Sequence, residues 1–395
     1  MKGEQVRSDC YVSLTLSSDG GISINLKSKV KALYGESILN LCHDILGFYK
    51  IENAIVKIDD SGALTFTIAA RIEAAIKQLI DSDKEFLLPF NENSIYKTVF
   101  DKPRRTRLYL PGNNPKLMVN AGIYGSDAII LDLEDSVAPD KKQEARFLVR
   151  NALRSIDFYG TERMVRINQL PAGIEDLAYV IPHNVHVILI PKCESAEQVR
   201  MVDSEISKIL GKENNEVYLM PIIESAKGII NAYGIATASK NCAALAIGLE
   251  DYTADIGTQR TAGGSESVYA RSIVVNAARA AGIQPIDSVF SDIDDMEALA
   301  ENVNASKALG FVGMGCIHPR QIPVINKNYL PEAEEITKAK KIVLAFEKAQ
   351  SEGIGVVTVG SKMIDAPVVK RAVSTIENAV KSGILDNDWR ITDGK

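Results

Sequence analysis

The sequence predicts an α/β protein built on a (β/α)8 TIM barrel with a carboxy-terminal lid, preceded by a small α+β domain. From Arg105 onward, apolar strands and helix-like stretches alternate eight times in roughly 220 residues, the size expected of such a barrel. Before Arg105 the pattern is one of short alternating strands, and after Leu330 it is mainly helical. No GxGxxG motif follows a strand, which disfavours the alternative of an open, doubly wound sheet.

These changes of pattern divide the chain into four predicted segments. They are the α+β domain at 1–83, a linker at 84–103, the barrel at 104–330 and a helical lid region at 331–395. In the first segment, alternating strands at 10–16 and 22–26 flank turn residues, which predicts a hairpin. A helix near 36–48, two strands around the turn 59–62 and a helix at 69–80 complete the domain.

The barrel strands are predicted from short apolar runs. These runs lie near 107–110, 127–131, 163–167, 186–190, 217–223, 243–248, 285–290 and 311–317. Helix-like stretches separate them, for example 267–281, which Gly282 ends as a C′ residue. Beyond the barrel we expect a helix from Pro331 to about Gly353, a strand at 353–360 and a last helix at 366–381.

Composition narrows the class of protein. The chain is 46% hydrophobic and 24% charged, with a net charge of −6, so it offers no electrostatic footprint for nucleic acid or an anionic membrane. No apolar run approaches the roughly 20 residues of a membrane span. The five cysteines are far apart and never in CxxC spacing, which disfavours disulfides and a zinc site and predicts a cytoplasmic protein.

Two acidic residues stand where successive apolar runs stop. Glu224 follows the run 217–223 and Asp251 follows the run 243–250. The carboxyl ends of barrel strands share one face, which is where active sites of this fold form. Mg²⁺ is usually held by one or two carboxylates together with water and substrate oxygens. The pair therefore predicts a magnesium site.

Other strand ends also carry polar residues. They are Glu134, Asp135, Asn168, Lys192, Asp292 and His318. Arg166 lies inside an apolar run and must be paired, either structurally with Glu134 or Asp135 or with a substrate carboxylate. His318 is a candidate to line the site, although a core role is an equal alternative. Taken alone, Asp365 has the pattern of an N-cap residue that precedes Pro367.

The barrel segment resembles the citrate lyase β-subunit and malyl-CoA lyase family. The resemblance covers about 104–382 in order. It rests on Arg105-Thr-Arg-Leu-Tyr-Leu-Pro-Gly-Asn113, Ala128-Ile-Ile-Leu-Asp-Leu-Glu-Asp-Ser-Val-Ala-Pro139, Val165-Arg-Ile-Asn168, Ile190-Pro-Lys-Cys-Glu-Ser195, Pro221-Ile-Ile-Glu-Ser-Ala-Lys-Gly228, Gly248-Leu-Glu-Asp251 and Ile317-His-Pro-Arg-Gln-Ile322. It implies a Mg²⁺-dependent barrel that cleaves a 3-hydroxy-acyl thioester into a 2-oxo acid and an acetyl thioester.

The resemblance also implies roles for individual residues. Glu224 and Asp251 hold the metal, and Arg166 faces the oxo-acid half of the substrate. Gly360-Ser-Lys-Met-Ile-Asp-Ala-Pro367 resembles the family's lid motif, whose aspartate, here Asp365, reaches the site of a neighbouring subunit. A homo-oligomer, a trimer or a hexamer, is therefore expected. Arg105, Asn168 and His318 are expected to contact substrate.

The first 83 residues resemble the acyl-carrier γ-subunit of citrate lyase. The resemblance rests on Val6-Arg-Ser-Asp9, Gly21-Ile-Ser-Ile-Asn-Leu-Lys-Ser-Lys-Val30, Tyr34-Gly-Glu-Ser-Ile38 and Ile58-Asp-Asp-Ser-Gly-Ala-Leu64. It implies a phosphoribosyl dephospho-CoA prosthetic group on Ser8, with Ser17 or Ser18 as alternatives. Arg7 stands where the family usually has Glu, and Ala70 departs from a basic position.

The chemistry of the reaction assigns further roles. Mg²⁺ lowers the pKa of the substrate hydroxyl and polarises the forming ketone. Asp365 from another subunit is the candidate to exchange a proton with the enolate carbon. The hydroxyl proton goes to a metal-bound water or to Glu134. An arm on Ser8 would deliver substrate at about millimolar effective concentration, with 81–103 as the hinge.

Three functional hypotheses follow. The favoured one is a lyase for citryl or citramalyl thioesters that is fused to its own carrier and served by a separate acyl transferase α-subunit. The second is a lyase for free CoA thioesters with a vestigial carrier domain, and the third is a non-catalytic scaffold. The sequence leaves open whether the 2-oxo acid is oxaloacetate, pyruvate or glyoxylate.

Overall fold

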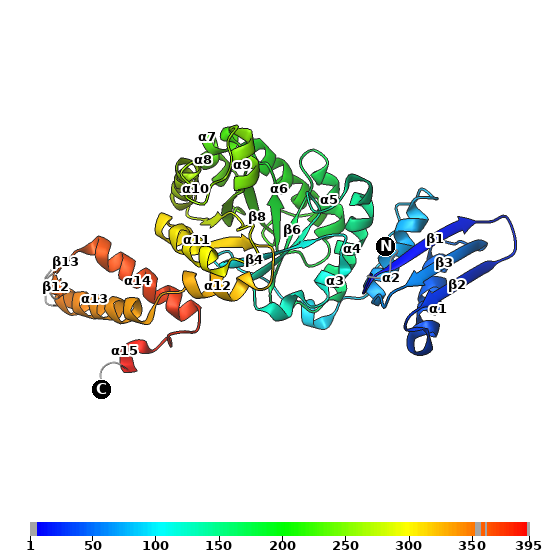
Figure 1. Cartoon of the computed structure of the whole chain (residues 1–395), viewed down its shortest axis with the longest axis horizontal. Helices are drawn as coiled ribbons and strands as arrows, with labels where there is room; N and C mark the ends of the chain where they lie inside the picture. Colours follow the sequence, from blue (N-terminus) through cyan, green and yellow to red (C-terminus); the bar gives the residue numbers. More distant parts are fainter. Residues whose placement is uncertain (1–5, 352–356, 360–361, 393–395) are drawn as a thin grey trace.

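A computed structural model of the chain describes residues 6–351, 357–359 and 362–392. The expected strand at 353–360 lies partly outside these residues, as do Gly360 and Ser361 of the lid motif. Figure 1 shows three bodies in a row, with the barrel between the amino-terminal domain and a carboxy-terminal helical hairpin. None of the helices in the described ranges is long and apolar enough to cross a membrane.

Eight parallel strands form a closed barrel, which confirms the predicted fold. The strands are β4 (Thr106–Pro111), β5 (Ala128–Asp132), β6 (Glu162–Arg166), β7 (Val187–Ile190), β8 (Tyr218–Ile223), β9 (Ala244–Ile247), β10 (Gln284–Asp287) and β11 (Gly313–Cys316). They pair in sequence order, and β11 pairs with β4 to close the sheet. Each predicted apolar run contains or overlaps one of these strands. The carboxyl ends of the strands therefore form one rim, as a barrel requires.

Helices surround the barrel, and α10 (Val268–Ala280) covers nearly all of the stretch 267–281 that the sequence predicted as helical. The main ones are α4 (Lys142–Ser155), α5 (Gly173–Val180), α6 (Ala196–Leu210), α10 (Val268–Ala280), α11 (Met296–Leu309) and α12 (Gln321–Tyr329). Shorter helices are α3 (Pro115–Met118), α7 (Ala226–Ile230), α8 (Ala232–Ala236) and α9 (Leu249–Asp255). Gly282 has a φ of 73° directly after α10, the left-handed conformation predicted for a helix C′ residue.

The amino-terminal domain differs from its predicted topology. It contains β1 (Cys10–Leu16), β2 (Ile22–Ser28), α1 (Lys31–Phe48), β3 (Ala54–Asp60) and α2 (Thr65–Lys77). The predicted hairpin is wrong, because β3 lies between β1 and β2 and pairs with both. The second strand expected after the turn 59–62 is also absent, since α2 begins at Thr65. Local alternation identifies strands, but strand order depends on long-range packing.

The segment between the domain and the barrel is not the expected hinge. Ser94 and Tyr96 accept hydrogen bonds on their carbonyl oxygens from the Arg163 guanidinium, at 2.6 Å and 3.2 Å. The Tyr96 hydroxyl donates to the Thr161 carbonyl at 2.6 Å. Glu85 pairs with Arg150 of α4 at 3.1 Å. These bonds hold the segment against the barrel, so it cannot swing while they persist.

The carboxy-terminal hairpin packs around a small core of its own. Its elements are α13 (Ala333–Ser351), β12 (Val357–Val359), β13 (Lys362–Ile364), α14 (Ala366–Lys381) and α15 (Trp389–Thr392). Both long helices agree with the predicted ones. The far end of α14 is attached to the amino-terminal side of the barrel, because Lys381 pairs with Asp101 at 2.8 Å and Arg105 donates to the Ser382 hydroxyl.

A buried ion pair lies beneath the barrel. The Arg104 guanidinium donates to both carboxylate oxygens of Glu162 at 2.8 Å and 2.9 Å, and both side chains are fully buried. Removal of one partner leaves a buried charge without compensation, which costs about 3–5 kcal/mol.

We therefore expect Glu162→Ala to lower the free energy of unfolding by about 3–5 kcal/mol. Urea unfolding followed by circular dichroism measures this, because the single tryptophan reports on the carboxy-terminal hairpin instead. Glu175→Ala is the control, since Glu175 is 72% exposed in its pair with Arg146 and its loss should cost less than about 1 kcal/mol. Equal losses in the two variants would contradict the interpretation.

Candidate functional site

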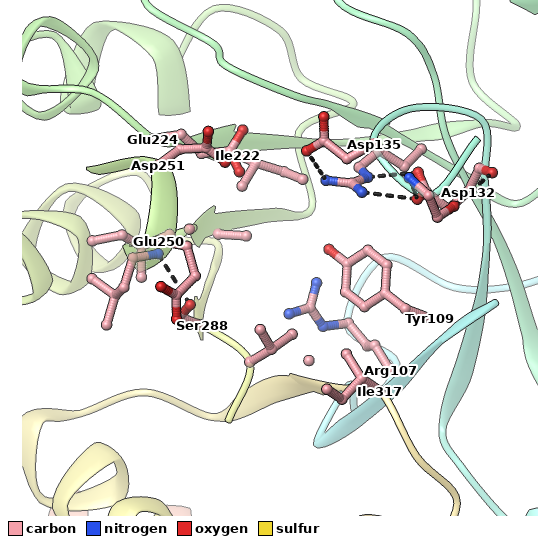
Figure 2. A pocket seen from close by; sticks show the side chains of 18 of the residues that line it. Arg107, Tyr109, Asp132, Asp135, Ile222, Glu224, Glu250, Asp251, Ser288 and Ile317 are labelled. Carbon is pink, nitrogen blue, oxygen red and sulfur yellow. Dashed lines mark hydrogen bonds and ion pairs between the residues drawn. The ribbon is translucent and has the colours of Figure 1, made fainter. Parts of the chain in front are cut away.

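A cavity of about 470 Å³ opens at the carboxyl ends of the barrel strands. Figure 2 shows charged side chains from several strands meeting around it. Its polar lining comprises Arg107, Tyr109, Asp132, Asp135, Ser136, Arg166, Glu224, Glu250, Asp251, Asp287 and Ser288. The fold therefore brings together Arg166, Glu224 and Asp251, which come from three different parts of the sequence.

Arg166 is held by acidic residues of the strand β5 and its following loop. Its Nε and Nη2 donate to the two carboxylate oxygens of Asp132 at 2.7 Å and 2.8 Å, and its Nη1 lies 2.7 Å from Glu134 Oε2. Burial alone would lower the pKa of Arg166, but the Asp132 carboxylate raises it, so the guanidinium stays charged. The expected ion pair of Arg166 with Glu134 is present, but the main partner of Arg166 is Asp132, which the sequence did not predict. The strand register explains this pairing, since Asp132 and Arg166 are cross-strand partners.

Glu224 is held at the end of β8 by a close approach of the backbone. A Cβ atom at Gly248 would lie 2.8 Å from Glu224 Cγ, so glycine at this position leaves room for the carboxylate. The Lys192 backbone N–H donates to Glu224 Oε2 at 2.7 Å. Burial raises the pKa of Glu224 to about 7, against the lowering effect of that N–H. The carboxylate is thus fixed in position and sensitive to pH near neutrality.

The Lys192 ammonium lies among the carboxylates of the site. Its Nζ is 3.4 Å from Asp251 Oδ1, 3.5 Å from Glu134 Oε1 and 3.8 Å from Asp135 Oδ1. Lys192 also has a φ of 46°, a conformation that side-chain-bearing residues rarely adopt. The motif 190–195 contained this residue, but the sequence assigned it no role. The arrangement shows that this group of carboxylates favours a cation.

The donor set fits a hard divalent cation. In the described ranges 6–351, 357–359 and 362–392, no three His, Cys, Asp or Glu side chains form a cluster that could hold a metal. Mg²⁺ does not need such a cluster, because one or two carboxylates with water and substrate oxygens suffice. Glu224 and Asp251 both line the cavity, and Asp251 is 43% exposed and open to a ligand. This pair could hold Mg²⁺ without displacing a structural partner other than Lys192.

Glu134 lies behind the cavity wall. It is 3% exposed, contacts Arg166 and Lys192, and accepts a hydrogen bond from Gln169 Nε2 at 3.1 Å. Burial raises its pKa above the usual range for a glutamate, opposed by Arg166. Its carboxylate therefore contacts residues of the site, but it does not itself line the cavity.

Three predicted substrate ligands do not reach this cavity. Arg105 precedes β4 and pairs with Asp127 at 2.7 Å on the opposite, amino-terminal side of the barrel. The Asn168 side chain donates to Asp176 of α5 at 2.8 Å, and the His318 Nδ1 accepts from the Arg320 N–H at the start of α12. None of the three lines the cavity, and a substrate contact for them stays a prediction. Arg107, two residues after Arg105, is the arginine of β4 that lines it.

Asp365 is the N-cap of α14, as its local pattern predicted. Its carboxylate accepts from the Val368 N–H at 3.2 Å. α14 has 16 residues and is about 24 Å long, and its other end is attached to the amino-terminal side of the barrel. Figure 1 shows the hairpin projecting away from the barrel of its own chain. Asp365 is therefore remote from the cavity of its own subunit.

Ser8 lies at the end of β1 that faces the barrel. It is half-buried with a φ of 57°, and its N–H donates to the Ser61 carbonyl at 3.1 Å. The next residue, Asp9, accepts two hydrogen bonds from Arg71, each 3.1 Å long. Arg71 also donates to Glu144 of α4 and to the Asn113 carbonyl, in the loop after β4. Ser17 and Ser18 lie just past the other end of β1, a strand of seven residues that is itself about 20 Å long.

Comparison with known proteins decides the family. Residues 105–319 match the family model described as HpcH/HpaI aldolase/citrate lyase, which is more than half of the chain. The chain belongs to the HpcH/HpaI aldolase/citrate lyase family. Residues 2–79 match a second model, described as malonate decarboxylase delta subunit and named ACP, which confirms a carrier-like amino-terminal domain.

The most similar relatives include carbon–carbon lyases. The citrate lyase subunit beta of Leuconostoc mesenteroides subsp. cremoris is 39% identical over 73% of this chain and 97% of that protein. The mitochondrial citramalyl-CoA lyase of Homo sapiens is 33% identical over 73% of this chain and 88% of that protein. CitE from Mycobacterium tuberculosis, solved with magnesium, acetoacetate and coenzyme A, has 29% identity and a TM-score of 0.59 over 71% of this chain and 99% of that one. The protein is accordingly a carbon–carbon lyase of this family.

We expect Gly248→Ala to destabilise the protein by about 1–3 kcal/mol, because the added methyl group overlaps Glu224. Urea unfolding measures the change. Gly263→Ala is the matched control, since no atom lies within 4 Å of a Cβ atom built there, and its free energy of unfolding should stay within about 0.5 kcal/mol of the parent. If Gly248→Ala were as stable as Gly263→Ala, the close approach would not constrain Glu224.

Proposed function

We propose that the protein is a Mg²⁺-dependent lyase that cleaves a citryl or citramalyl thioester carried on its own amino-terminal domain. The products would be a 2-oxo acid and an acetyl thioester. The observation that supports this most strongly is the cavity in which Arg166, Glu224 and Asp251 converge at the rim of a lyase-family barrel. The magnesium in the related CitE structure and the carrier-like match of residues 2–79 add support.

The residues of the cavity suit this reaction. Bound between Glu224 and Asp251, Mg²⁺ would supply Lewis-acid polarisation of the oxygen that becomes the ketone. Arg166 has five N–H donors, of which two donate to Asp132, so that the remaining donors can serve a substrate carboxylate. Glu134, whose carboxylate contacts Arg166 and Lys192 of the site, is one candidate to accept the hydroxyl proton, and a metal-bound water is the other.

Asp365 would complete the site from a neighbouring subunit. Its distance from the cavity of its own chain supports a role in another copy, where it would exchange a proton with the acetyl carbon. A homo-oligomer, a trimer or a hexamer, then becomes necessary for full activity. We also propose a separate acyl transferase subunit that loads the carrier.

The position of Ser8 supports the delivery of substrate by an attached arm. Both barrel partners of Arg71 lie on the rim that bears the cavity: Asn113 follows Pro111 of β4, and Glu144 lies in the first turn of α4. Ser8 is therefore held close to the mouth of the barrel by its neighbour Asp9. A phosphoribosyl dephospho-CoA group on Ser8 would move as an arm, while the domain stays in place. Ser17 and Ser18 have no such link to the barrel.

Intact-protein mass spectrometry of the chain from its native host, combined with lyase assays, tests the proposal. We expect a mass increment that Ser8→Ala removes and Ser17→Ala keeps, and loss of carrier-dependent turnover in Ser8→Ala.

Glu224→Ala should lower turnover at least about 100-fold, a loss of about 2.7 kcal/mol in transition-state stabilisation. Assays with citryl, citramalyl and malyl thioesters identify the oxo acid. An unmodified Ser8 in a protein that cleaves free citramalyl-CoA would instead support the alternative with a vestigial carrier.

The affinity for Mg²⁺ should depend on pH through Glu224. Its pKa is raised to about 7, and only the ionised carboxylate binds a cation, so affinity is lost as the pH falls through 7. The ionised fraction rises from about 9% at pH 6 to about 91% at pH 8, which predicts an affinity about tenfold higher at pH 8. Isothermal titration calorimetry measures this, with Glu224→Gln as the variant in which the dependence disappears. The same slope in both proteins would exclude Glu224 as the source.

A further inference from the structure

Arg107 is a buried cation without a counter-charge. It is 2% exposed, and in the described part of the chain no carboxylate forms an ion pair with it. Its Nη1 lies 3.0 Å from Met220 Sδ, and its Nη2 lies 3.5 Å from the Asp287 carbonyl oxygen. Its Nε is buried and has no hydrogen-bond partner. A thioether and one distant carbonyl are weak partners for a guanidinium.

This state is costly for the folded protein. An ion that leaves water loses several kcal/mol of hydration free energy, which a paired carboxylate would offset. Three other buried arginines of this chain have such partners: Arg104 pairs with Glu162, Arg150 with Glu73 and Arg271 with Asp287. Burial lowers the pKa of Arg107, whereas acidic neighbours raise the pKa of Arg166. Arg154 and Arg163 also lack a carboxylate, but backbone carbonyl oxygens accept from them at 2.5–3.2 Å, whereas the one carbonyl contact of Arg107 is 3.5 Å long.

The side chain faces the cavity of the proposed site. Arg107 and Tyr109 alternate into the barrel along β4, and both line the cavity together with Arg166 and Glu224. Figure 2 shows the Arg107 guanidinium at the cavity, on the side across from Glu224 and Asp251. A buried guanidinium that lines a ligand cavity and has only weak partners calls for an anionic group on the ligand.

The geometry points to Arg107 as the residue that binds a second carboxylate of the substrate, so that the protein prefers a citryl thioester to a citramalyl thioester. This inference rests on the proposed function and narrows its substrate class. Both thioesters have the carboxylate assigned to Arg166. They differ at one further position, where the citryl group has a carboxymethyl arm and the citramalyl group has a methyl. Only the former can pair with Arg107, and the oxo acid released is then oxaloacetate.

Substrate discrimination by Arg107→Met tests this assignment. The parent should have the higher kcat/KM for the citryl thioester. In Arg107→Met that value should fall at least about 100-fold, whereas the value for the citramalyl thioester should stay within about threefold of the parent. A parent that prefers the citramalyl thioester, or equal losses on both substrates, would overturn the inference.

Product binding and stability separate this inference from the proposed function. By calorimetry, Arg107→Met should lose affinity for oxaloacetate but keep its affinity for pyruvate, even if neither thioester proves to be a substrate. Without ligand, its Tm should stay the same or rise, because an unpaired buried charge is replaced by an apolar side chain. Arg104→Met is the matched control and should lower the Tm, since it leaves Glu162 unpaired. A comparable fall in Tm for Arg107→Met would show that Arg107 is structural.

Discussion

Closure of the parallel sheet between β11 and β4 is the constraint on which the site depends. Gly313 makes this closure possible, because a Cβ atom there would collide with the Arg104 backbone. Closure brings the carboxyl ends of all eight strands to one rim and places Arg107 of β4, Arg166 of β6 and Glu224 of β8 around a single cavity. The same closure excludes water from these charges, which strengthens their interactions with one another and with a ligand.

The sequence predicted the repeating strands and helices of the barrel more successfully than the side-chain contacts that depend on strand register. The eight strands and the long helices of the barrel follow from local periodicity, and Glu224 and Asp251 follow from their places at strand ends. The partner of Arg166 does not, because only the pairing of β5 with β6 sets Asp132 opposite it. Likewise, Arg105 and Arg107 are equivalent in a linear motif, but only Arg107 lies within β4, whereas Arg105 precedes the strand and pairs with Asp127. The strand order of the amino-terminal domain was predicted wrongly, because it also depends on long-range pairing and not on local alternation.

The two appended bodies relate to the barrel in different ways. The amino-terminal domain is joined to the site-bearing rim through Arg71, and the segment after it is bonded to the barrel, so that the attachment point of the proposed arm is fixed. The carboxy-terminal hairpin is attached at the opposite side and carries Asp365 outward. The amino-terminal domain can therefore serve the cavity of its own chain, whereas the carboxy-terminal hairpin suits the cavity of a second copy.

The central claim is that Glu224 and Asp251 hold a divalent cation at the mouth of the barrel. The most direct measurement is an anomalous difference map from crystals of the full chain soaked in Mn²⁺ in place of Mg²⁺. We predict one strong peak between the two carboxylates, within about 2.6 Å of an oxygen of each, with the Lys192 ammonium displaced. A map with no peak there, or with its strongest peak on other residues, would contradict the account.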